Sequence, residues 1–263
     1  MAEVAWSQPV RSGTAQPALA GVDPELLHKN PERIRQMFAE VAPRYDLLNR
    51  LLSFGMDVRW RRWAARLSPR PLDGPVLDVC CGTGDLALAY WEASGRQASV
   101  VGVDFCLPML RLAARKAERL GAVRHTAWLV ADALRLPFPA DSFQVVAVAF
   151  GIRNVASPQE ALTEMTRVCK PGGQVAVLEF SLPSHAALRA VYLWYFRRIL
   201  PKVGNLVAGS RQNAYSYLPA SVGQFEFGEP FLKRFSSVGL ADLRMRPLTG
   251  GIATLYLGYK PAA

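Results

Sequence analysis

Cysteine and histidine are scarce in this sequence, which contains 4 and 3 of them among 263 residues. The cysteines are Cys80, Cys81, Cys106 and Cys169, and no two of them have the CxxC spacing of a zinc site. Neither a metal centre nor a disulfide framework is therefore expected. Reduced thiols are typical of the cytosol, so the composition favours a cytoplasmic protein.

Long hydrophobic runs are absent as well. No uncharged stretch approaches the roughly 20 residues that a membrane-spanning helix needs. Residues 1–24 mix Ala, Pro, Ser and Gly without the basic start and apolar core of a signal peptide, so we expect a disordered tail there. We expect the rest of the chain, 25–263, to form one domain.

Acidic residues are outnumbered by basic ones, 21 against 31, which gives a net charge of +10. A charge of this sign favours an anionic partner, which could be a nucleic acid, an acidic ligand or an anionic membrane surface. The basic residues are scattered along the chain, and no RNA-binding motif or module is recognisable. A nucleic acid partner is therefore not expected.

Short apolar runs alternate with amphipathic helical patterns between residues 75 and 180. This alternation predicts an α/β fold with a mostly parallel sheet that helices cover on both faces. The predicted strands contain the segments "PVLDV", "SVVGVD", "HTAWLVAD", "SFQVVAVAF" and "QVAVLEF".

The segments on either side have other patterns. Residues 31–67 have helical periodicity and are predicted to form an N-terminal helical cap. An aromatic helix is predicted at 185–200, a loop at 213–225, and a helix near 228–238. Two strand-like runs close the chain, and their short separator "TGG" predicts an antiparallel hairpin.

The segment "VLDVCCGTGDLA" runs from the first predicted strand through a glycine turn into a helix. Glycines at Gly82 and Gly84, on either side of Thr83, would let backbone N–H groups approach a ligand closely. Asp78 lies inside the strand, and Asp104 ends the second strand, where a carboxylate can accept hydrogen bonds from both hydroxyls of a ribose. A nicotinamide dehydrogenase is the alternative, but it would usually show GxGxxG at this turn.

This layout resembles the class I methyltransferases, which use S-adenosylmethionine and end in an antiparallel hairpin. The resemblance implies that the turn holds the methionine part of the cofactor and that Asp104 holds its ribose. It also implies that Asp132 and Ala133, after the third strand, meet the adenine. One departure is Cys80, which stands where the family usually has the first glycine of its motif.

A narrower resemblance is carried by "FAEVAPRYDLLNRLLSFGMDVRWRR", "FGIRNV", "EMTRVCKPGGQVAVLEFSLP", "YSYLPASV" and "LTGGIATLYLGYK". These segments are similar to the quinone C-methyltransferases of menaquinone and ubiquinone biosynthesis, over residues 32–260. The resemblance implies methylation of a ring carbon of a prenylated quinol. "VCCGTGD" favours the naphthoquinol (demethylmenaquinol) over the benzoquinol of ubiquinone biosynthesis. An O-methyltransferase acting on a small phenol and an RNA methyltransferase remain as alternatives.

Arg153 and Asn154 follow the fourth predicted strand, at the sheet edge where ligands bind in such folds. They are the first candidates for catalysis, with Arg153 stabilising a phenolate, because a guanidinium is too basic to accept the proton itself. Asn154 could orient the hydroxyl of the quinol or cap the next helix. Tyr45 and Asp46 of the cap are further candidates, with Asp46 as a base, as a helix cap or as a partner of Arg44. Ala149 stands where the family usually has serine.

A prenylated quinol resides in the bilayer, so the resemblance also implies peripheral contact with an anionic membrane surface. The predicted helix near 57–67 segregates tryptophans from arginines, which fits an interfacial helix or a helix that packs its tryptophans into the core. The predicted aromatic helix at 185–200 could line a tunnel for the prenyl tail or form a face of a homodimer.

Overall fold

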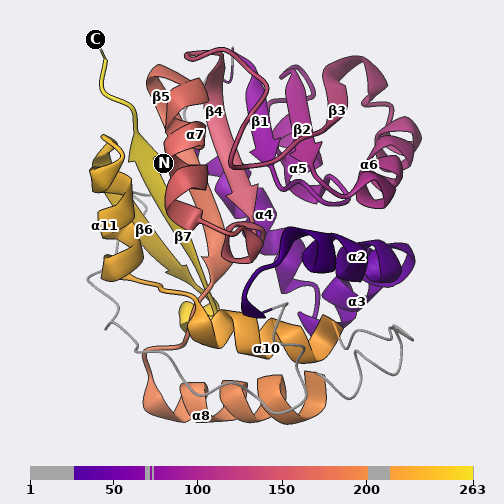
Figure 1. Cartoon of the computed structure of the whole chain (residues 1–263), viewed down its shortest axis with the longest axis vertical. Coiled ribbons are helices and arrows are strands. Elements are labelled where there is room, and N and C mark those ends of the chain that lie inside the picture. Colours follow the sequence, from indigo (N-terminus) through magenta and orange to yellow (C-terminus); the bar gives the residue numbers. More distant parts are fainter. Residues whose placement is uncertain (1–26, 69–71, 73, 201–213, 263) are drawn as a thin grey trace.

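The computed structural model describes residues 27–68, 72, 74–200 and 214–262. The predicted tail at 1–24 lies outside this range. Seven strands form one sheet in the order β3-β2-β1-β4-β5-β7-β6 (Figure 1). Their bounds are β1 Val76–Val79, β2 Val100–Asp104, β3 Thr126–Val130, β4 Phe143–Ala149, β5 Cys169–Phe180, β6 Ala241–Leu248 and β7 Ala253–Tyr259.

The first five strands are parallel, and β7 pairs antiparallel with both β5 and β6. The central strands β1 and β4 are rich in valine and buried along almost their whole length, as expected for parallel strands that are covered on both faces. The predicted mixed sheet with its C-terminal antiparallel hairpin is thus confirmed.

Helices cover both faces of the sheet. One hydrophobic core contains side chains of α4 and α5 against the strands, and a second contains side chains of α7 and α11 against the other face (Figure 1). The bounds are α4 Met56–Arg66, α5 Asp85–Ala93, α6 Leu107–Leu120, α7 Pro158–Val168 and α11 Glu229–Ser237. Ser157 caps α7 by accepting from the N–H of Glu160.

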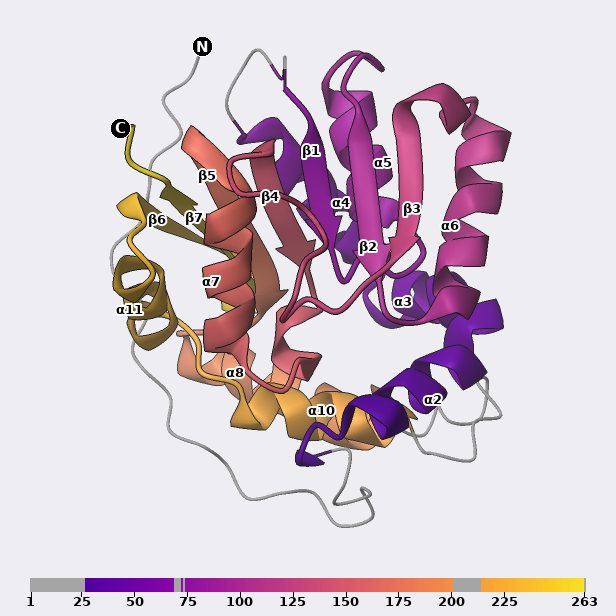
Figure 2. The ribbon, with the colours of Figure 1, turned by 45° about the horizontal axis from the view of Figure 1, so that its top comes forward.

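The remaining helices gather at the carboxyl ends of the parallel strands, below the arrowheads in Figure 2. A third core joins the N-terminal helices to those between β5 and β6 through side chains that include Ile34, Tyr192 and Tyr217. The bounds are α2 Pro31–Val41, α3 Tyr45–Leu52, α8 Ala186–Trp194 with its π-helical extension Tyr195–Ile199, and α10 Ala214–Gln224. These elements close the end of the sheet where ligands bind in doubly wound folds.

The expectation of a loop at 213–225 was wrong, because α10 occupies most of this segment. Pro219 and Gly223 lie in it and argued for a loop. Burial of Tyr217, Ala220 and Val222 stabilises the helix by more than Pro219 and Gly223 destabilise it. Tertiary packing therefore decides this element, and it brings Tyr217 to the end of the sheet.

Candidate active site

The glycine turn between β1 and α5 contains two glycines that are needed for different reasons. Gly82 has φ +53°, lines a cavity, and a Cβ built on it would meet no atom within 4 Å. Gly84 has φ +80°, and a Cβ there would lie 2.6 Å from Trp128 Cη2. Gly82 thus keeps space free for a ligand, whereas Gly84 allows the turn to pack on β3.

Cys80 occupies the position where the class I motif usually has glycine, and it adopts the left-handed conformation with φ +53°. Room for its side chain comes from Gly151, because a Cβ on Gly151 would lie 2.5 Å from Cys80 Cβ. The departure from the motif is therefore accommodated by a glycine at the end of β4 rather than by a change of the turn.

Asp78 has one carboxylate oxygen bonded and one free of partners. Its Oδ2 accepts the N–H of Ala87 at 2.9 Å, while its buried Oδ1 has no partner within the described part of the chain. Burial raises the pKa of Asp78 to about 8. An unpartnered buried oxygen that lines a cavity is ready to accept a bond from a ligand cation.

Asp104 at the end of β2 also lines this cavity. Its two oxygens accept the N–H groups of Gly82 and Cys106, at 2.8 and 2.9 Å. Burial raises the pKa of Asp104 to about 6, against the lowering effect of these bonds. A carboxylate oxygen can accept more than one hydrogen bond, so Asp104 can hold the turn and also bind ligand hydroxyls.

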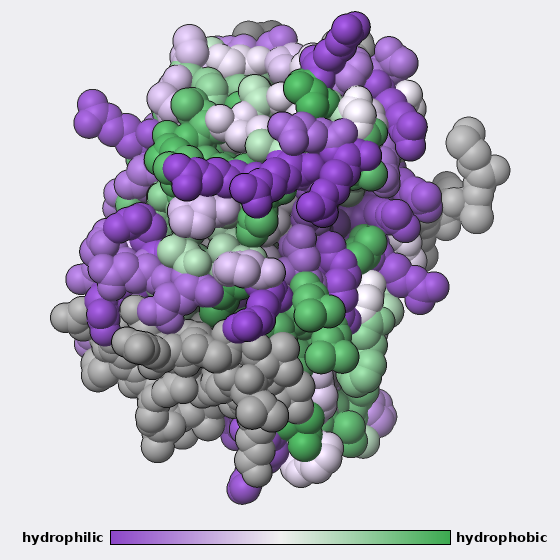
Figure 3. All heavy atoms as spheres, turned by 90° about the vertical axis from the view of Figure 1, so that its right-hand side faces the viewer, coloured by the Kyte–Doolittle hydropathy of each residue, from purple (hydrophilic) through white to green (hydrophobic). Residues whose placement is uncertain are grey.

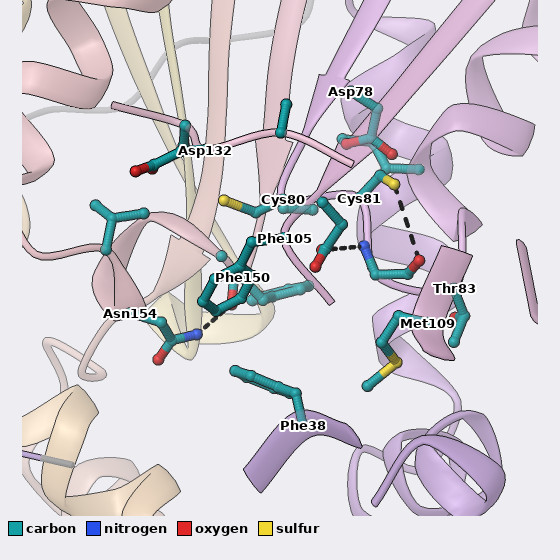
Figure 4. A pocket seen from close by; sticks show the side chains of 18 of the residues that line it. Phe38, Asp78, Cys80, Cys81, Thr83, Phe105, Met109, Asp132, Phe150 and Asn154 are labelled. Atoms are coloured by element: carbon teal, nitrogen blue, oxygen red, sulfur yellow. Dashed lines mark hydrogen bonds between the residues drawn. The ribbon is translucent and has the colours of Figure 1, made fainter. Parts of the chain in front are cut away.

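We call this cavity, of about 160 Å³, the polar cavity. Figure 4 shows Asp132 and Asn154 on one side of it and Thr83 and Met109 on the other. The structure brings together around it all but one of the residues that were predicted to bind the cofactor; Gly84 does not line it. Those that do are Asp78, Gly82, Thr83, Asp104, Asp132 and Ala133.

Asp46 does not face either cavity, as a catalytic base would need to do. Its Oδ1 accepts from the Thr83 hydroxyl at 2.6 Å, and its Oδ2 pairs with Lys116 Nζ at 2.7 Å. Asp46 lines neither the polar cavity nor the second cavity described below. The geometry therefore favours a structural role, but with Thr83 and Lys116 rather than the expected Arg44, and Asp46 ties α3 to the glycine turn.

A cluster of cations surrounds Asp85, the first residue of α5. Arg50 of α3 bonds to it at 2.6 Å, and Lys116 of α6 is also paired with it. Burial alone would raise the pKa of Asp85, but the charges of Arg61, Lys116 and Arg50 outweigh burial and hold the pKa at about 2. This cluster fastens the cap helices to the turn.

Arg153 and Asn154 lie in the short turn after β4, and both are buried. Arg153 Nη1 pairs with Glu179 Oε1 of β5 at 2.9 Å, and its guanidinium lies 5.3 Å from the centroid of the Phe180 ring. Asn154 Oδ1 accepts from the Tyr217 hydroxyl at 3.0 Å. Arg153 is thus held by a carboxylate and does not itself face the polar cavity.

A second, larger cavity of about 250 Å³ adjoins the first and is lined mostly by hydrophobic side chains. We call it the apolar cavity. Arg153 lines it, together with aromatic residues of α8 and its extension. The two cavities share a wall made of Phe38, Tyr45, Arg61 and Phe150. Burial raises the pKa of Tyr45, so its hydroxyl keeps its proton more firmly than a free tyrosine.

Arg61, Glu179 and Tyr217 belong to this region but were not predicted from the sequence. Arg61 is buried in the shared wall, bonds to Asp57 at 2.7 Å, and lies 5.1 Å from the centroid of the Phe150 ring. The predicted helix near 57–67 contains several arginines, and the sequence does not indicate which of them points into the protein. Glu179 is an acidic residue inside an apolar strand, which is a signal that sequence reasoning could have used.

The two tryptophans of α4 have different environments. Trp60 is buried and donates from Nε1 to the Thr249 hydroxyl at 2.9 Å. Trp63 is 44% exposed and lies under the Arg246 guanidinium. The interpretation of core packing therefore holds for Trp60, and α4 does not present both tryptophans to solvent.

Comparison with known proteins agrees with this geometry. A model of the family described as "ubiE/COQ5 methyltransferase family" matches residues 27–260. The chain is 48% identical to the "Demethylmenaquinone methyltransferase" of Thermus thermophilus over 225 residues, which are 86% of this chain and 100% of the relative. It is 45% identical to the "Ubiquinone/menaquinone biosynthesis C-methyltransferase UbiE" of Geobacter sulfurreducens, over 89% of this chain and 91% of the relative.

Two solved structures of similar fold are named as methyltransferases. One is a SAM-dependent methyltransferase of Thermotoga maritima, with a TM-score of 0.59 and 18% identity over 86% of this chain and 99% of that one. Another is an N-methyltransferase of Haemonchus contortus that contains S-adenosylhomocysteine, with a TM-score of 0.53 and 17% identity over 74% of this chain and 51% of that one. At these identities the likeness shows the fold alone.

Proposed function

The chain belongs to the ubiE/COQ5 methyltransferase family, and within that family we propose that it methylates a ring carbon of a demethylated prenyl naphthoquinol. It is an S-adenosylmethionine-dependent C-methyltransferase. The observation that carries the choice of substrate class is the pair of adjoining cavities, one polar and one apolar, with a common wall. A polar cofactor and an apolar acceptor can then meet across that wall.

The polar cavity fits the cofactor. The unpartnered Asp78 Oδ1 suits the ammonium of the methionine part, and Arg61 in the wall suits its carboxylate. Asp104 suits the ribose hydroxyls, with Asp132 and Ala133 at the adenine end. When bound there, the cofactor supplies a methyl group on a positively charged sulfur.

The protein must orient the acceptor ring and favour its ionised form. Removal of a phenolic proton makes the ring carbon electron-rich, but a phenol with a pKa near 10 ionises little at neutral pH. The Arg153 guanidinium lines the apolar cavity and keeps its charge, so it can stabilise a developing phenolate there. Because Glu179 and the Phe150 carbonyl hold Arg153 in place, little reorganisation is needed as the charge forms.

Asn154 and Tyr217 complete this arrangement. The Tyr217 hydroxyl fixes the amide of Asn154 at the edge of the polar cavity. Positioning of this kind can lower a reaction barrier by several kcal/mol without any metal or acid–base group. Asn154 is thus assigned to orientation of the reactants. The phenolic proton finally passes to solvent.

The naphthoquinol is favoured over the benzoquinol because relatives from Thermus thermophilus and Bacillus cereus are named demethylmenaquinone methyltransferases, at 48% and 38% identity. The relative from Geobacter sulfurreducens carries both quinones in its name, so the benzoquinol is the second candidate. We assign neither an RNA substrate nor O-methylation to the chain.

The decisive experiment combines the purified protein, S-adenosylmethionine labelled in its methyl group, and either reduced demethylmenaquinone or its benzoquinol counterpart. Label on a ring carbon of the naphthoquinol is expected. Label on an oxygen would make the protein an O-methyltransferase, and label on neither quinol would overturn the proposed substrate class.

A membrane surface is the proposed partner of the enzyme. No helix in the described ranges is long and apolar enough to cross a bilayer. Exposed hydrophobic side chains nevertheless lie on α3, in the turn that follows it and on α8, and we call them the apolar rim. Its members are Leu47, Leu51, Phe54, Val191 and Trp194.

Two contacts join the segment that contains α3 to the end of α8. Phe54 is 81% exposed and also lines the apolar cavity, which marks the mouth. The Tyr195 hydroxyl donates to the Leu52 carbonyl at 2.9 Å, and the rings of Phe54 and Tyr195 lie 5.9 Å apart. Figure 3 shows hydrophobic side chains gathered in the lower half of one face, below a mostly hydrophilic region.

The charge beside the apolar rim fits anionic lipid. Residues 186–199 contain three arginines, all exposed, and no acidic residue. Two copies of this face brought together about a two-fold axis would place these like charges opposite one another, which disfavours a homodimer here. We therefore propose peripheral docking of this face on the inner surface of the cell membrane, where a prenylated quinol can enter the cavity directly.

A further inference from the structure

Tyr192 carries a buried polar atom that the fold itself does not use. The residue is 8% exposed, and its hydroxyl has no hydrogen-bond partner among the described residues. Buried hydroxyls almost always have a partner, and one without a partner costs stability. An exception of this kind calls for an explanation from function or from a bound molecule.

The position of Tyr192 supplies that explanation. It lies on the inner face of α8 and lines the apolar cavity, as does Arg153. Its ring stacks on Phe196 with a centroid distance of 4.9 Å, which holds the ring in one orientation. Burial raises the pKa of Tyr192 far above its usual value, while the nearby Arg153 charge acts in the opposite direction. The hydroxyl therefore keeps its proton and can donate a hydrogen bond at every ordinary pH.

Other polar side chains in the same cavity are already satisfied. The Tyr195 hydroxyl donates to the Leu52 carbonyl, and the Tyr217 hydroxyl donates to Asn154. Arg153 is paired with Glu179. Among the described residues that line this cavity, Tyr192 is thus the one tyrosine whose buried hydroxyl has no hydrogen-bond partner.

We propose that the Tyr192 hydroxyl donates a hydrogen bond to one ring oxygen of the quinol, while Arg153 faces the other. The inference rests on the proposed function and deepens it, because it names how the acceptor is recognised. A 1,4-hydroquinone carries oxygens on opposite sides of its ring, so two donors fix both its position and its rotation in the cavity. Rotation decides which ring carbon faces the cofactor.

The test compares Tyr192→Phe with the matched control Tyr195→Phe. Replacement of an unpartnered buried hydroxyl leaves the thermal stability of the ligand-free protein unchanged or higher, whereas Tyr195→Phe breaks an existing bond and lowers it. For the quinol, Tyr192→Phe is expected to lower kcat/KM about tenfold or more, since a donor to the ring is lost. The KM for the cofactor should not change.

A substrate series gives a readout that a structural role would not move. The two demethylated naphthols that each lack one ring hydroxyl are compared with the full quinol. The Tyr192→Phe loss should vanish for one of the two naphthols and persist for the other. An equal loss for all three acceptors, or a drop in stability without any loss in kcat/KM, overturns the inference and assigns the hydroxyl to structure.

Failure of the proposed function remains distinguishable. Binding of oxidised 1,4-naphthoquinone in the presence of S-adenosylhomocysteine needs no turnover and can be followed by quenching of tryptophan fluorescence. The parent protein could methylate no quinol and yet bind the quinone more tightly than Tyr192→Phe does. That result would support recognition by Tyr192 and overturn the proposed substrate. If the parent protein methylates the quinol and Tyr192→Phe does so with equal kinetics, the proposed substrate is supported and recognition by Tyr192 is overturned.

Discussion

The polar and apolar cavities lie side by side, yet they are built in opposite ways. The polar cavity is formed by strand ends and a glycine turn, with backbone N–H groups and carboxylates in its lining. The apolar cavity is formed by helices that come from both ends of the chain, with aromatic side chains and a few buried polar groups. The first therefore depends on local chain geometry, and the second on tertiary packing.

Each cavity contains a buried group with an unpartnered oxygen, Asp78 in the first and Tyr192 in the second. The two differ in charge. Asp78 is suited to a cation, and Tyr192 to a neutral or anionic oxygen. Among the described residues, one buried polar atom in the lining of each cavity is thus without a partner, and each complements a different reactant.

The largest expected effect comes from the buried ion pair next to the shared wall. Arg153→Ala leaves the Glu179 charge buried without its partner, which should cost about 3–5 kcal/mol of stability. The double variant Arg153→Met with Glu179→Gln should recover most of the melting temperature. Turnover should stay at least about a hundredfold low in the double variant, because the group that stabilises the phenolate is gone. Recovery of turnover as well would reduce Arg153 to a structural role.

A second prediction uses pH to separate the cavities. Asp78 has a pKa of about 8 in the folded protein against an ordinary value of 3.8, so between these limits the folded state binds more protons than the unfolded state. The free energy of unfolding should therefore fall as pH rises through this window, up to about pH 8. Asp78→Asn should remove this part of the slope and be the more stable form above pH 8.

Cofactor binding should respond in the opposite direction. A cationic ammonium binds the carboxylate form of Asp78, so the affinity of the parent for S-adenosylhomocysteine should rise toward pH 8. Asp78→Asn should bind about 10- to 100-fold more weakly at that pH. Titration calorimetry at several pH values measures both effects. Quinone binding in the apolar cavity is the internal control and should be unaffected.

A third prediction concerns the apolar rim. Val191→Ser with Trp194→Ser changes exposed residues that line neither cavity, and it should lower partitioning to vesicles containing phosphatidylglycerol about tenfold. The control is Leu120→Ser with Val123→Ser, which are exposed residues at the end of α6 and in the short 3-10 helix that follows it. Cosedimentation measures binding. A change from dimer to monomer with unaltered vesicle binding would identify the rim as an interface between copies.

The smallest effect, a change in stability, is expected at Cys80 and Gly151, which line the polar cavity. Cys80→Gly should change stability by no more than about 1 kcal/mol, because relief of the left-handed strain offsets the added chain entropy. Gly151→Ala should cost about 1–3 kcal/mol, since its Cβ would lie 2.5 Å from that of Cys80. In the double variant part of that cost should disappear, as measured by chemical denaturation of all four proteins. Simple additivity would show that the two positions are independent.

Much of the polar cavity could be predicted from the sequence. Its strands and glycine turn are encoded by patterns that each span only a few residues. The carboxyl ends of parallel strands then bring Asp78, Asp104 and Asp132 to one sheet edge. The sequence could not decide between the alternatives for Asp46, because a carboxylate near the site looks the same in sequence whether it faces a ligand or Lys116. Arg61 was missed because a helical arginine shows no direction before the helix is packed.

The sequence by itself determined the sheet, its parallel order with a closing hairpin, the glycine turn and the family, since these depend on local periodicity and short motifs. Only the tertiary structure decided the apolar cavity. Its walls join α2 and α3 to α8 and α10, and α10 is a helix only because Tyr217 and its neighbours are buried there. The pairing of Arg153 with Glu179 and the unpartnered hydroxyl of Tyr192 follow from that packing. Contacts between distant segments depend on the whole fold, which no local pattern records.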